Sequence, residues 1–479
     1  MSHNNKWGFW LLTAFVVGNM VGSGIFMLPS TLAQTASPLG VTLAWMLTGF
    51  GVLMIALVFG NLSVRRPELT AGPQSYARAL FRSPQTGNMA GFSMVWGYWI
   101  ANASGNVAVI TTFAGYLSAF FPVMKEKSIL FHFFGIPMET GKFITFLVCS
   151  ALLWGIHAIL IRGLSGAGKL NFIATFTKVL GFALFIGAAL SVFDAKNLGA
   201  WYTPVTDSDG ITHNLWSQVT TAALSTLWAF VGIESAVVLS GRARSQRDVK
   251  KATIAGLVIA VIIYLAITML TMGVLPQEVL KASDKPLVDA LTFVIGNTGA
   301  TLMALLAITS LLGTAIGWIL LGTEAPFQGA QSGMFPAFLG KVNRHGSPIA
   351  ALTATNLISQ LFIFSTVSNT IAEAFQFVIT IATLASLMPY LVSAVYQLKL
   401  VVTGETYRGE RPGVRAGDGL VALLAVVYAV WVIKSGTSDM KTLLFGLGLF
   451  AVGLLFYPFM TRRSARTNET LPSAAAELK

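Results

Sequence analysis

The chain has 479 residues, of which 54% are apolar and only 10% are charged, and its formal net charge is +12. A soluble protein carries roughly 25% charged residues because its surface has to be solvated. This composition excludes an ordinary soluble domain and indicates a protein whose solvent is lipid. The single cysteine, Cys149, excludes internal disulfides and any multi-cysteine metal site.

Twelve apolar segments follow one another along the chain, and most have the roughly twenty residues needed to cross about 30 Å of hydrocarbon. We predict spans at about 9–34, 40–62, 89–122, 143–161, 170–193, 215–240, 252–275, 288–325, 348–368, 372–398, 417–433 and 442–460. The longer segments should be tilted or broken, and 348–398 could also be divided elsewhere. The segments between the spans are too short to bury a core, so the sequence predicts an all-α integral membrane protein with a single domain over 1–479.

Lysine and arginine are distributed unevenly between the two sides of this predicted membrane domain. Twelve spans place both termini on the same side, and most of the 31 basic residues lie in the loops and tails of that side. This positive-inside pattern predicts that both termini, including the polar tail 464–479, are cytoplasmic. It also explains the positive net charge without a nucleic-acid partner.

Two of the spans contain residues that interrupt helices. The first reads VVGNMVGSGIFMLP, with Gly22, Gly24 and Pro29, and the sixth reads STLWAFVGIESAVVLSG, with Gly232 and Glu234 near its middle. A lone glycine would indicate only close helix packing. Interruptions at corresponding positions of two halves indicate an inverted-repeat transporter instead. We therefore predict that both helices are discontinuous.

Unwinding a helix inside the membrane has a chemical consequence. The freed backbone N–H and C=O groups find no partner in lipid, so they have to line a polar cavity or hold a ligand. The N–H groups that begin a half-helix attract a carboxylate, and the freed carbonyls attract an ammonium group. A broken helix is thus suited to the zwitterionic end that all amino acids share.

Four segments carry a resemblance to a known family: GSGIF at 22–26, GYWIANASGN at 97–106, LWAFVGIESA at 227–236 and LLGTAIGWILL at 311–321. They resemble the amino acid–polyamine–organocation superfamily, and within it the basic amino acid/polyamine antiporters, over nearly the whole chain. The resemblance implies a five-plus-five inverted repeat of the leucine-transporter type in the cell (inner or plasma) membrane of a prokaryote. It implies these parts: repeat one at about 7–193, repeat two at about 215–399, helices 11 and 12 at about 417–461, and the cytoplasmic tail 464–479.

The resemblance also implies roles for individual residues of the two breaks. The substrate carboxylate would be held by backbone groups of Gly22, Ser23, Gly24 and Ile25. The substrate ammonium would be held by the carbonyl groups of Ala229, Phe230 and Gly232.

Further site residues that the resemblance implies lie outside the breaks or at their edge. Trp228 would cover the bound substrate, and Trp318 would stack on a cationic side chain, although taken alone it could be a packing or interfacial tryptophan. A desolvated cation–π contact of this kind contributes about 2 kcal/mol. Asn106 would bind the guanidinium or amine. The same wall would include Tyr98, Ala101 and Asn102, and Thr380 falls where a serine is expected.

Charged side chains inside spans are the last signal. A charge at mid-bilayer costs at least roughly 2.5–3.5 kcal/mol, so such groups usually pair or serve function. Glu234 matches a gating or proton-coupling glutamate. Lys178 resembles a lysine that replaces a sodium ion in some relatives, with structural pairing to a carboxylate as the alternative. Glu324 would face a cytoplasmic vestibule, and His157 would be a satisfied core or interfacial histidine.

The resulting expectation is a transporter and not an enzyme, without cofactor or metal, that exchanges arginine for ornithine by alternating access. Lys178 and Glu324 fit the arginine–ornithine branch, whereas Asn102 and Thr380 depart from the arginine–agmatine pattern. Alternatives are lysine–cadaverine or histidine–histamine exchange, proton symport of a neutral amino acid, and a membrane amino acid sensor. The expected partners are amino acid substrates and the lipid bilayer. Glycines of the last span, such as Gly446, leave a homodimer open.

Overall fold

The computed structural model describes residues 7–69, 72–133, 136–162, 165–206, 210, 212–238, 240, 243–331, 333–368, 370–437, 444 and 446–458. The first half contains α1 (Phe9–Met20), α2 (Gly24–Thr35), α3 (Pro38–Arg65), α4 (Pro73–Leu80), α5 (Pro84–Leu117), η2 (Pro122–Lys125), β1 (Ile129–Phe133), β2 (Ile136–Glu139), α6 (Thr140–Ile161), α7 (Ser165–Val192), η3 (Ala195–Leu198) and β3 (Val205–Thr206). The second half contains β4 (Thr212–His213), α8 (Leu215–Trp228), α9 (Ser235–Val238), α10 (Gln246–Val274), α11 (Gln277–Lys281), α12 (Pro286–Gln331), η5 (Ala337–Gly340), α13 (Ile349–Ile363), α14 (Ser365–Ser368), α15 (Ile371–Thr403) and α16 (Pro412–Gly436). A further apolar helix covers Gly446–Pro458.

Local chemistry sets the ends of the long helices. The Ser37 side chain caps α3 by accepting from the N–H of Gly40, and Pro38 occupies the first turn, where its missing N–H costs nothing. Helix α15 begins with a capping box formed by Thr370 and Glu373 and ends at Gly404, whose φ of 70° lies in the left-handed region. These helices therefore begin and end where the sequence provides the caps.

The prediction of a multi-pass membrane protein is confirmed. Within the part of the chain that the structure describes, seven helices are long and apolar enough to cross a membrane, or eight when α1 and α2 count as one bent span. The seven are α3, α6, α10, α12, α13 with its extension to Val367, α15 and α16. Helix α5 has 34 residues, and its many small polar residues keep it out of this set.

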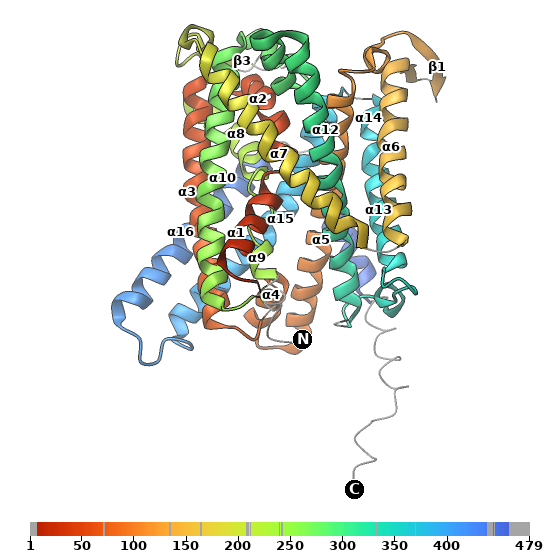
Figure 1. Cartoon of the computed structure of the whole chain (residues 1–479). Helices are drawn as coiled ribbons and strands as arrows, with labels where there is room; N and C mark the ends of the chain where they lie inside the picture. Colours follow the sequence, from red (N-terminus) through yellow and green to blue (C-terminus); the bar gives the residue numbers. More distant parts are fainter. Residues whose placement is uncertain are drawn as a thin grey trace.

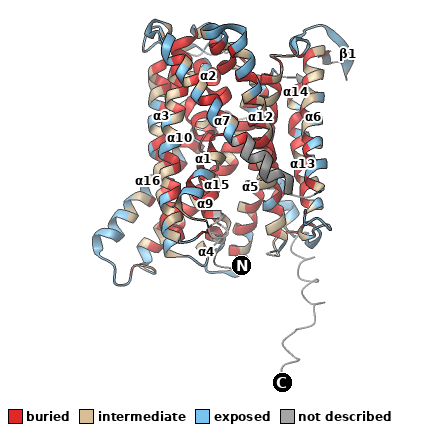
Figure 2. Cartoon of the chain, in the orientation of Figure 1, coloured by how far each residue is buried: buried red, intermediate tan, exposed pale blue. Residues whose placement is uncertain are grey.

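The long helices form one bundle (Figure 1). Helix α5 packs on α12 and α15, α12 packs on α7, and α3 packs on α10. Buried residues gather in these central helices, while α6 and α16 show exposed faces (Figure 2). The exposed residues of α16 include Leu420, Leu423 and Val427. An apolar outer face suits contact with lipid.

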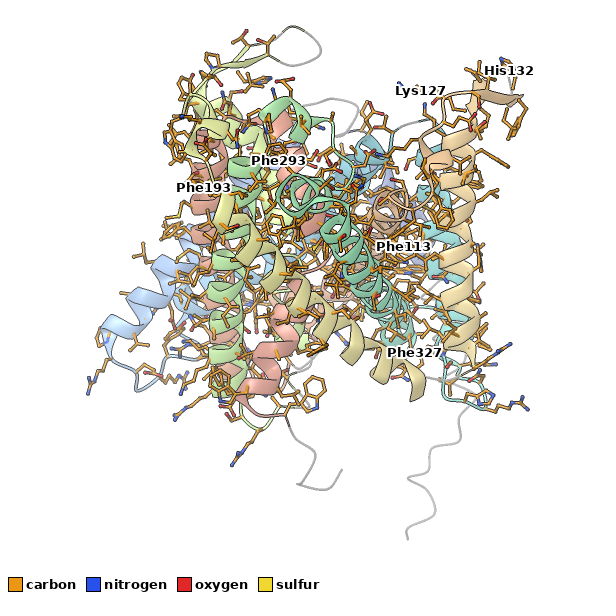
Figure 3. The ribbon with its side chains drawn as sticks, turned by 45° about the horizontal axis from the view of Figure 1, so that its top comes forward. Phe113, Lys127, His132, Phe193, Phe293 and Phe327 are labelled. Carbon is orange, nitrogen blue, oxygen red and sulfur yellow. The ribbon has the colours of Figure 1, made fainter. Side chains whose placement is uncertain are left out.

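The all-α prediction misses two short hairpins in the loops. Strands β1 and β2 pair antiparallel, and so do β3 and β4. The first hairpin, with Lys127 just before β1 and His132 within β1, projects from the upper end of the bundle as Figure 1 is oriented (Figure 3). Helix α4 lies at the opposite, lower end (Figure 1).

The long predicted span 288–325 is broken, as expected for a segment of this length. Gly296, with φ of 68°, interrupts α12.

Candidate functional site

The first predicted break is confirmed. Helix α1 ends at Met20, α2 begins at Gly24, and the two helices are bent by 44° at this point. The N–H of Gly22 donates to the carbonyl of Met20 at 2.7 Å, which is a turn and not a helical bond. Ser23 occupies the N-cap position of α2 without a side-chain cap, and its Oγ has no hydrogen-bond partner among the described residues. The N-terminus of α2 therefore offers uncapped donors inside the bundle.

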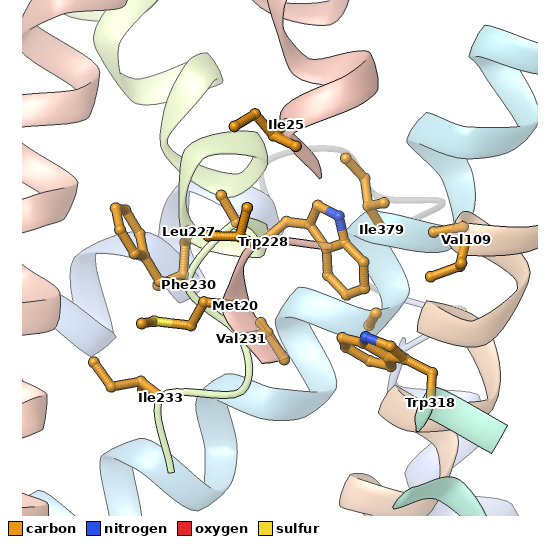
Figure 4. Packing of buried hydrophobic residues seen from close by; sticks show 14 of the residues in the cluster. Met20, Ile25, Val109, Leu227, Trp228, Phe230, Val231, Ile233, Trp318 and Ile379 are labelled. Carbon is orange, nitrogen blue, oxygen red and sulfur yellow. The ribbon is translucent and has the colours of Figure 1, made fainter. Parts of the chain in front are cut away.

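The second predicted break is confirmed as well. Helix α8 ends at Trp228 and α9 begins only at Ser235. Gly232 has φ of +107°, which a residue with a side chain rarely adopts. A Cβ at Gly232 would lie 3.3 Å from the Cβ of Asn19. A Cβ at Gly24 would lie 3.5 Å from the Cα of Ala229. The two breaks thus pack directly against each other, as Figure 4 shows for Met20, Trp228 and Phe230.

One hydroxyl joins the two breaks. The Oη of Tyr264 in α10 lies 2.6 Å from the carbonyl oxygen of Met20 and 2.7 Å from that of Ala229. A phenol has a single hydrogen, so it donates to one of these oxygens at a time. The ring is fixed by stacking on Trp45, with centroids 5.1 Å apart. Sequence reasoning missed Tyr264, because a single tyrosine in an apolar span does not show which carbonyl groups it will contact.

The indole rings of Trp228 and Trp318 lie against each other beside the two breaks. The centroids of Trp228 and Trp318 are 5.2 Å apart and their planes are inclined by 43° (Figure 4). A Cβ added to Gly105 of α5 would lie 2.6 Å from Cζ3 of Trp318 and 2.7 Å from Cη2 of Trp228. The structure therefore brings together the two tryptophans singled out in the sequence. It adds Gly105, whose missing side chain lets both rings approach α5.

Several buried polar atoms around the breaks have no hydrogen-bond partner within the described part of the protein. They are Asn19 Nδ2, Ser23 Oγ, both amide atoms of Asn106, Ser310 Oγ and Trp318 Nε1. Buried polar groups are usually paired, and an unpaired one costs about 1–3 kcal/mol. These atoms come from α1, α5, α12 and the segment before α2, so polar groups without a partner among the described residues gather from several elements.

Glu234 connects the sixth-span break to the helices beside it. The Oη of Tyr390 in α15 donates to its Oε2 at 2.5 Å, and the N–H of Gly232 donates to the same oxygen at 3.1 Å. The Tyr98 hydroxyl of α5 lies near this carboxylate. Asn102 donates its Nδ2 to the carbonyl of Tyr98 at 2.7 Å. Glu234 is 1% exposed, so the break, α5 and α15 meet at a buried carboxylate.

Comparison with known proteins decides the family. The model of the amino acid permease family matches residues 8–471. The chain belongs to the amino acid permease family. The permease is 59% identical over 463 residues to a putative arginine/ornithine antiporter of Bacillus subtilis (strain 168), with 97% of this chain and 98% of the relative covered. It is 35% identical to an arginine/ornithine antiporter of Pseudomonas aeruginosa, with 93% and 89% covered. It is 32% identical to the arginine/ornithine antiporter ArcD1 of Lactococcus lactis subsp. cremoris, with 95% and 85% covered. The permease is thus an amino acid transporter.

Lys178 of the permease lies beside the first break. Its Nζ is 3.4 Å from the carbonyl oxygen of Gly18, and the residue is 7% exposed. Among the described residues, no carboxylate forms a salt bridge with this ammonium group, so the alternative of structural pairing finds no support there. Lys178 thus contacts a backbone carbonyl of the first span, and its expected role in place of a sodium ion stays a prediction.

Three more residues named in the sequence analysis are Ile25, Ala101 and Thr380. Ile25, expected to bind the substrate carboxylate through its backbone, and Ala101, expected in the wall of the site, are both buried, and their roles stay predictions. Thr380 uses its hydroxyl hydrogen on the carbonyl of Gln376 in its own helix, at 2.8 Å.

His157 was expected to be a satisfied core or interfacial histidine. Its Nδ1 lies 3.1 Å from Nδ2 of Asn356, which confirms a satisfied core histidine.

Glu324 is the one intramembrane acid of the sequence analysis that stays accessible. It is exposed on α12 and accepts a hydrogen bond from Nε2 of Gln328 at 2.7 Å. This exposure agrees with a position in a vestibule, and the side on which that vestibule opens remains a prediction.

Proposed function

We propose that the permease exchanges arginine for ornithine by alternating access around a site between the two breaks. The observation that carries this proposal is the set of buried polar atoms around the breaks that have no partner within the described part of the chain. Two tryptophans beside that set suit a guanidinium, which is planar and weakly hydrated. The relatives named arginine/ornithine antiporters support the choice of substrates. The two interrupted spans that pack against each other support the mechanism.

The proposed topology has twelve spans with both termini in the cytoplasm. The spans are α1 with α2, α3, α5, α6, α7, α8 with α9, α10, α12, α13, α15, α16 and the helix Gly446–Pro458. The interruptions in the first and sixth of these support a five-plus-five inverted repeat, with repeat one over about 7–193 and repeat two over about 215–399. The positive-inside pattern then assigns the lower end of Figure 1 to the cytoplasm.

In this mechanism the two ends of the substrate are bound separately. The carboxylate accepts from N–H groups of Gly24 and Ile25 at the start of α2, where the helix dipole favours a negative charge. The ammonium group donates to the carbonyl of Ala229, which Tyr264 contacts in this structure. The guanidinium stacks on Trp318, and the Asn106 amide supplies a hydrogen bond.

The closing groups follow from the same geometry. Trp228 covers the bound substrate. The hydrogen bond from Tyr390 to Glu234 holds α15 against the sixth-span break, and Tyr98 of α5 lies near the same carboxylate. A bound zwitterion compensates the dipoles of the broken helices, so the loaded carrier changes conformation more readily than the empty one. That difference is what makes a carrier an exchanger.

The decisive experiment uses purified permease in lipid vesicles at a clamped membrane potential. Labelled arginine should enter vesicles preloaded with ornithine or arginine, and uptake into empty vesicles should be at least tenfold slower. Equally fast uptake into empty vesicles would reject exchange in favour of uniport or proton symport. Preloading with lysine, cadaverine, histidine or histamine then identifies the counter-substrate, and transport by any of these vesicles excludes a mere sensor.

A further inference from the structure

Three consecutive apolar residues of β1 are exposed outside the spans. The exposed fractions are 57% for Ile129, 53% for Leu130 and 38% for Phe131. A run of exposed apolar side chains is unfavourable in water and marks a surface that contacts something else. The sheet that β1 forms with β2 has two strands among the described residues. The hairpin therefore cannot cover its own apolar side chains.

The exposed side chains of β1 continue the outer surface of α6. The ring of Phe131 packs edge to face on the ring of Phe143 in the first turn of α6, with centroids 5.3 Å apart. Phe143, Leu147 and Ala151 follow one another at intervals of four residues, and the last two are exposed. Positions four apart share one face of a helix. Because α6 is long and apolar enough to cross a membrane, Phe131 lies at the upper end of a stripe that faces lipid.

The connection to α6 fixes the height of the hairpin in the membrane. Strand β2 ends at Glu139 and α6 begins at Thr140, so no linker separates them. The 22 residues of α6 span about 33 Å, which is close to the roughly 30 Å of the hydrocarbon core. The junction therefore lies at the boundary between acyl chains and headgroups. Figure 1 shows the hairpin extending outward from this end of α6, away from the rest of the bundle.

The backbone of the hairpin limits how deep it can lie. Strand β1 pairs with β2 along one edge, and the N–H and C=O groups of its other edge need water. Sheet edges exposed to lipid do not occur within the hydrocarbon region, whereas the headgroup layer is hydrated. Lys127, which is exposed just before β1, can extend its ammonium group toward the phosphates. The hairpin is thus suited to the headgroup layer, with its apolar side chains directed to the acyl chains.

We propose that the β1–β2 hairpin is an interfacial anchor, which inserts Ile129, Leu130 and Phe131 into the membrane leaflet at the upper end of Figure 1. Its partner is the phospholipid bilayer. Both η2 and β2 contact α6, so the anchor holds the upper end of this span at a fixed height. This role is independent of the solute that the permease carries.

The test places an environment-sensitive fluorophore on single cysteines before the permease is reconstituted into phospholipid vesicles. Cys149 is the single cysteine of the chain and is buried, and Cys149→Ala provides a background without it. Leu130→Cys reports on the hairpin, and Leu147→Cys reports on the lipid-facing stripe of α6. Thr212→Cys is the matched control, because Thr212 is exposed in the two-stranded β3–β4 hairpin at the same end of the bundle (Figure 1).

The fluorophore on Leu130→Cys should emit at a shorter wavelength than that on Thr212→Cys and should be protected from iodide added on both sides. Nitroxide-labelled phospholipids should place it roughly 5–10 Å into the boundary between headgroups and acyl chains, and shallower than the fluorophore on Leu147→Cys. Emission and iodide access equal to those of Thr212→Cys would overturn the proposal, because the hairpin then projects into water.

Protection from both iodide and the nitroxide-labelled lipids would overturn the proposal as well. In that case protein covers the hairpin, either a second copy of the chain or another partner. Because fluorescence needs no transport, the result is separate from the outcome of the vesicle exchange assay.

Discussion

At the scale of single residues, Trp318 shows how one side chain combines packing and recognition. Its ring packs on Trp228 and reaches α5 at Gly105, and its Nε1 has no partner among the described residues. A tryptophan that served packing alone would need no unpartnered N–H near an interrupted helix. The position beside the break is what supports a contact with a cationic substrate.

Trp318→Leu should therefore weaken arginine much more than a neutral analogue. Loss of a desolvated cation–π contact costs about 2 kcal/mol, which is roughly 30-fold in affinity. The measurement is competition against labelled arginine in preloaded vesicles by arginine and by citrulline, a neutral molecule of similar shape. Trp216→Leu is the control, because that tryptophan is 61% exposed on the outer surface. Equal losses for arginine and citrulline would assign Trp318 to packing.

At the scale of elements, the central feature is the connection between two interrupted spans. Tyr264 reaches the carbonyl of Met20 at the end of α1 and that of Ala229 just after α8. These carbonyls have lost their helical partners, so the phenol satisfies one of them at any moment. Helix α10 thereby fixes the relative position of the two half-helices around the site.

Tyr264→Phe keeps the ring and removes this hydroxyl. The free energy of unfolding should fall by about 1–3 kcal/mol, because a buried carbonyl loses its donor. Arginine should then raise the unfolding midpoint of the variant more than that of the wild type, since its ammonium group can bind the freed carbonyl of Ala229. Tyr76→Phe is the matched control, because Tyr76 is buried and its hydroxyl has no partner among the described residues. An unchanged midpoint in Tyr264→Phe would remove its assigned role.

The same scale shows what could be predicted from the sequence. The breaks were predictable because Gly-Ser-Gly at 22–24 and Gly232 are unusual inside spans and act locally. Tyr264 and Gly105 were not, because their effect depends on which helices pack together. Tyr264 lies 35 positions from Ala229, and no periodicity reports that contact. The β1–β2 hairpin was missed since its pairing forms within a short loop without a strong turn signal.

At the scale of the whole molecule, a polar network ties the lower end of the bundle together. Asp418 of α16 accepts from Arg65 at 2.8 Å, from Nδ2 of Asn61 at 2.9 Å and from the Tyr407 hydroxyl at 3.0 Å. Lys250 of α10 donates to Oδ1 of the same asparagine at 2.7 Å. One carboxylate thus links α3, α10 and α16, and through Tyr407 the segment after α15.

Asp418→Asn should destabilise the permease by about 3 kcal/mol, because it leaves the largely buried Arg65 without its main counter-charge. The measurement is the thermal unfolding midpoint in detergent. Glu405→Gln serves as the control, since its pair with Arg66 is half exposed and should contribute less than about 1 kcal/mol. A shift no larger than that of the control would show that the network does not hold α16 to the bundle.

The contact between Trp228 and Trp318 has a consequence for the empty carrier. With centroids 5.2 Å apart, the two rings leave no layer for a guanidinium between them, so arginine has to separate them in order to enter. If a guanidinium binds between the two rings, α8 and α12 must therefore move apart at this point, so that binding of the side chain would be coupled to a movement of both interrupted spans.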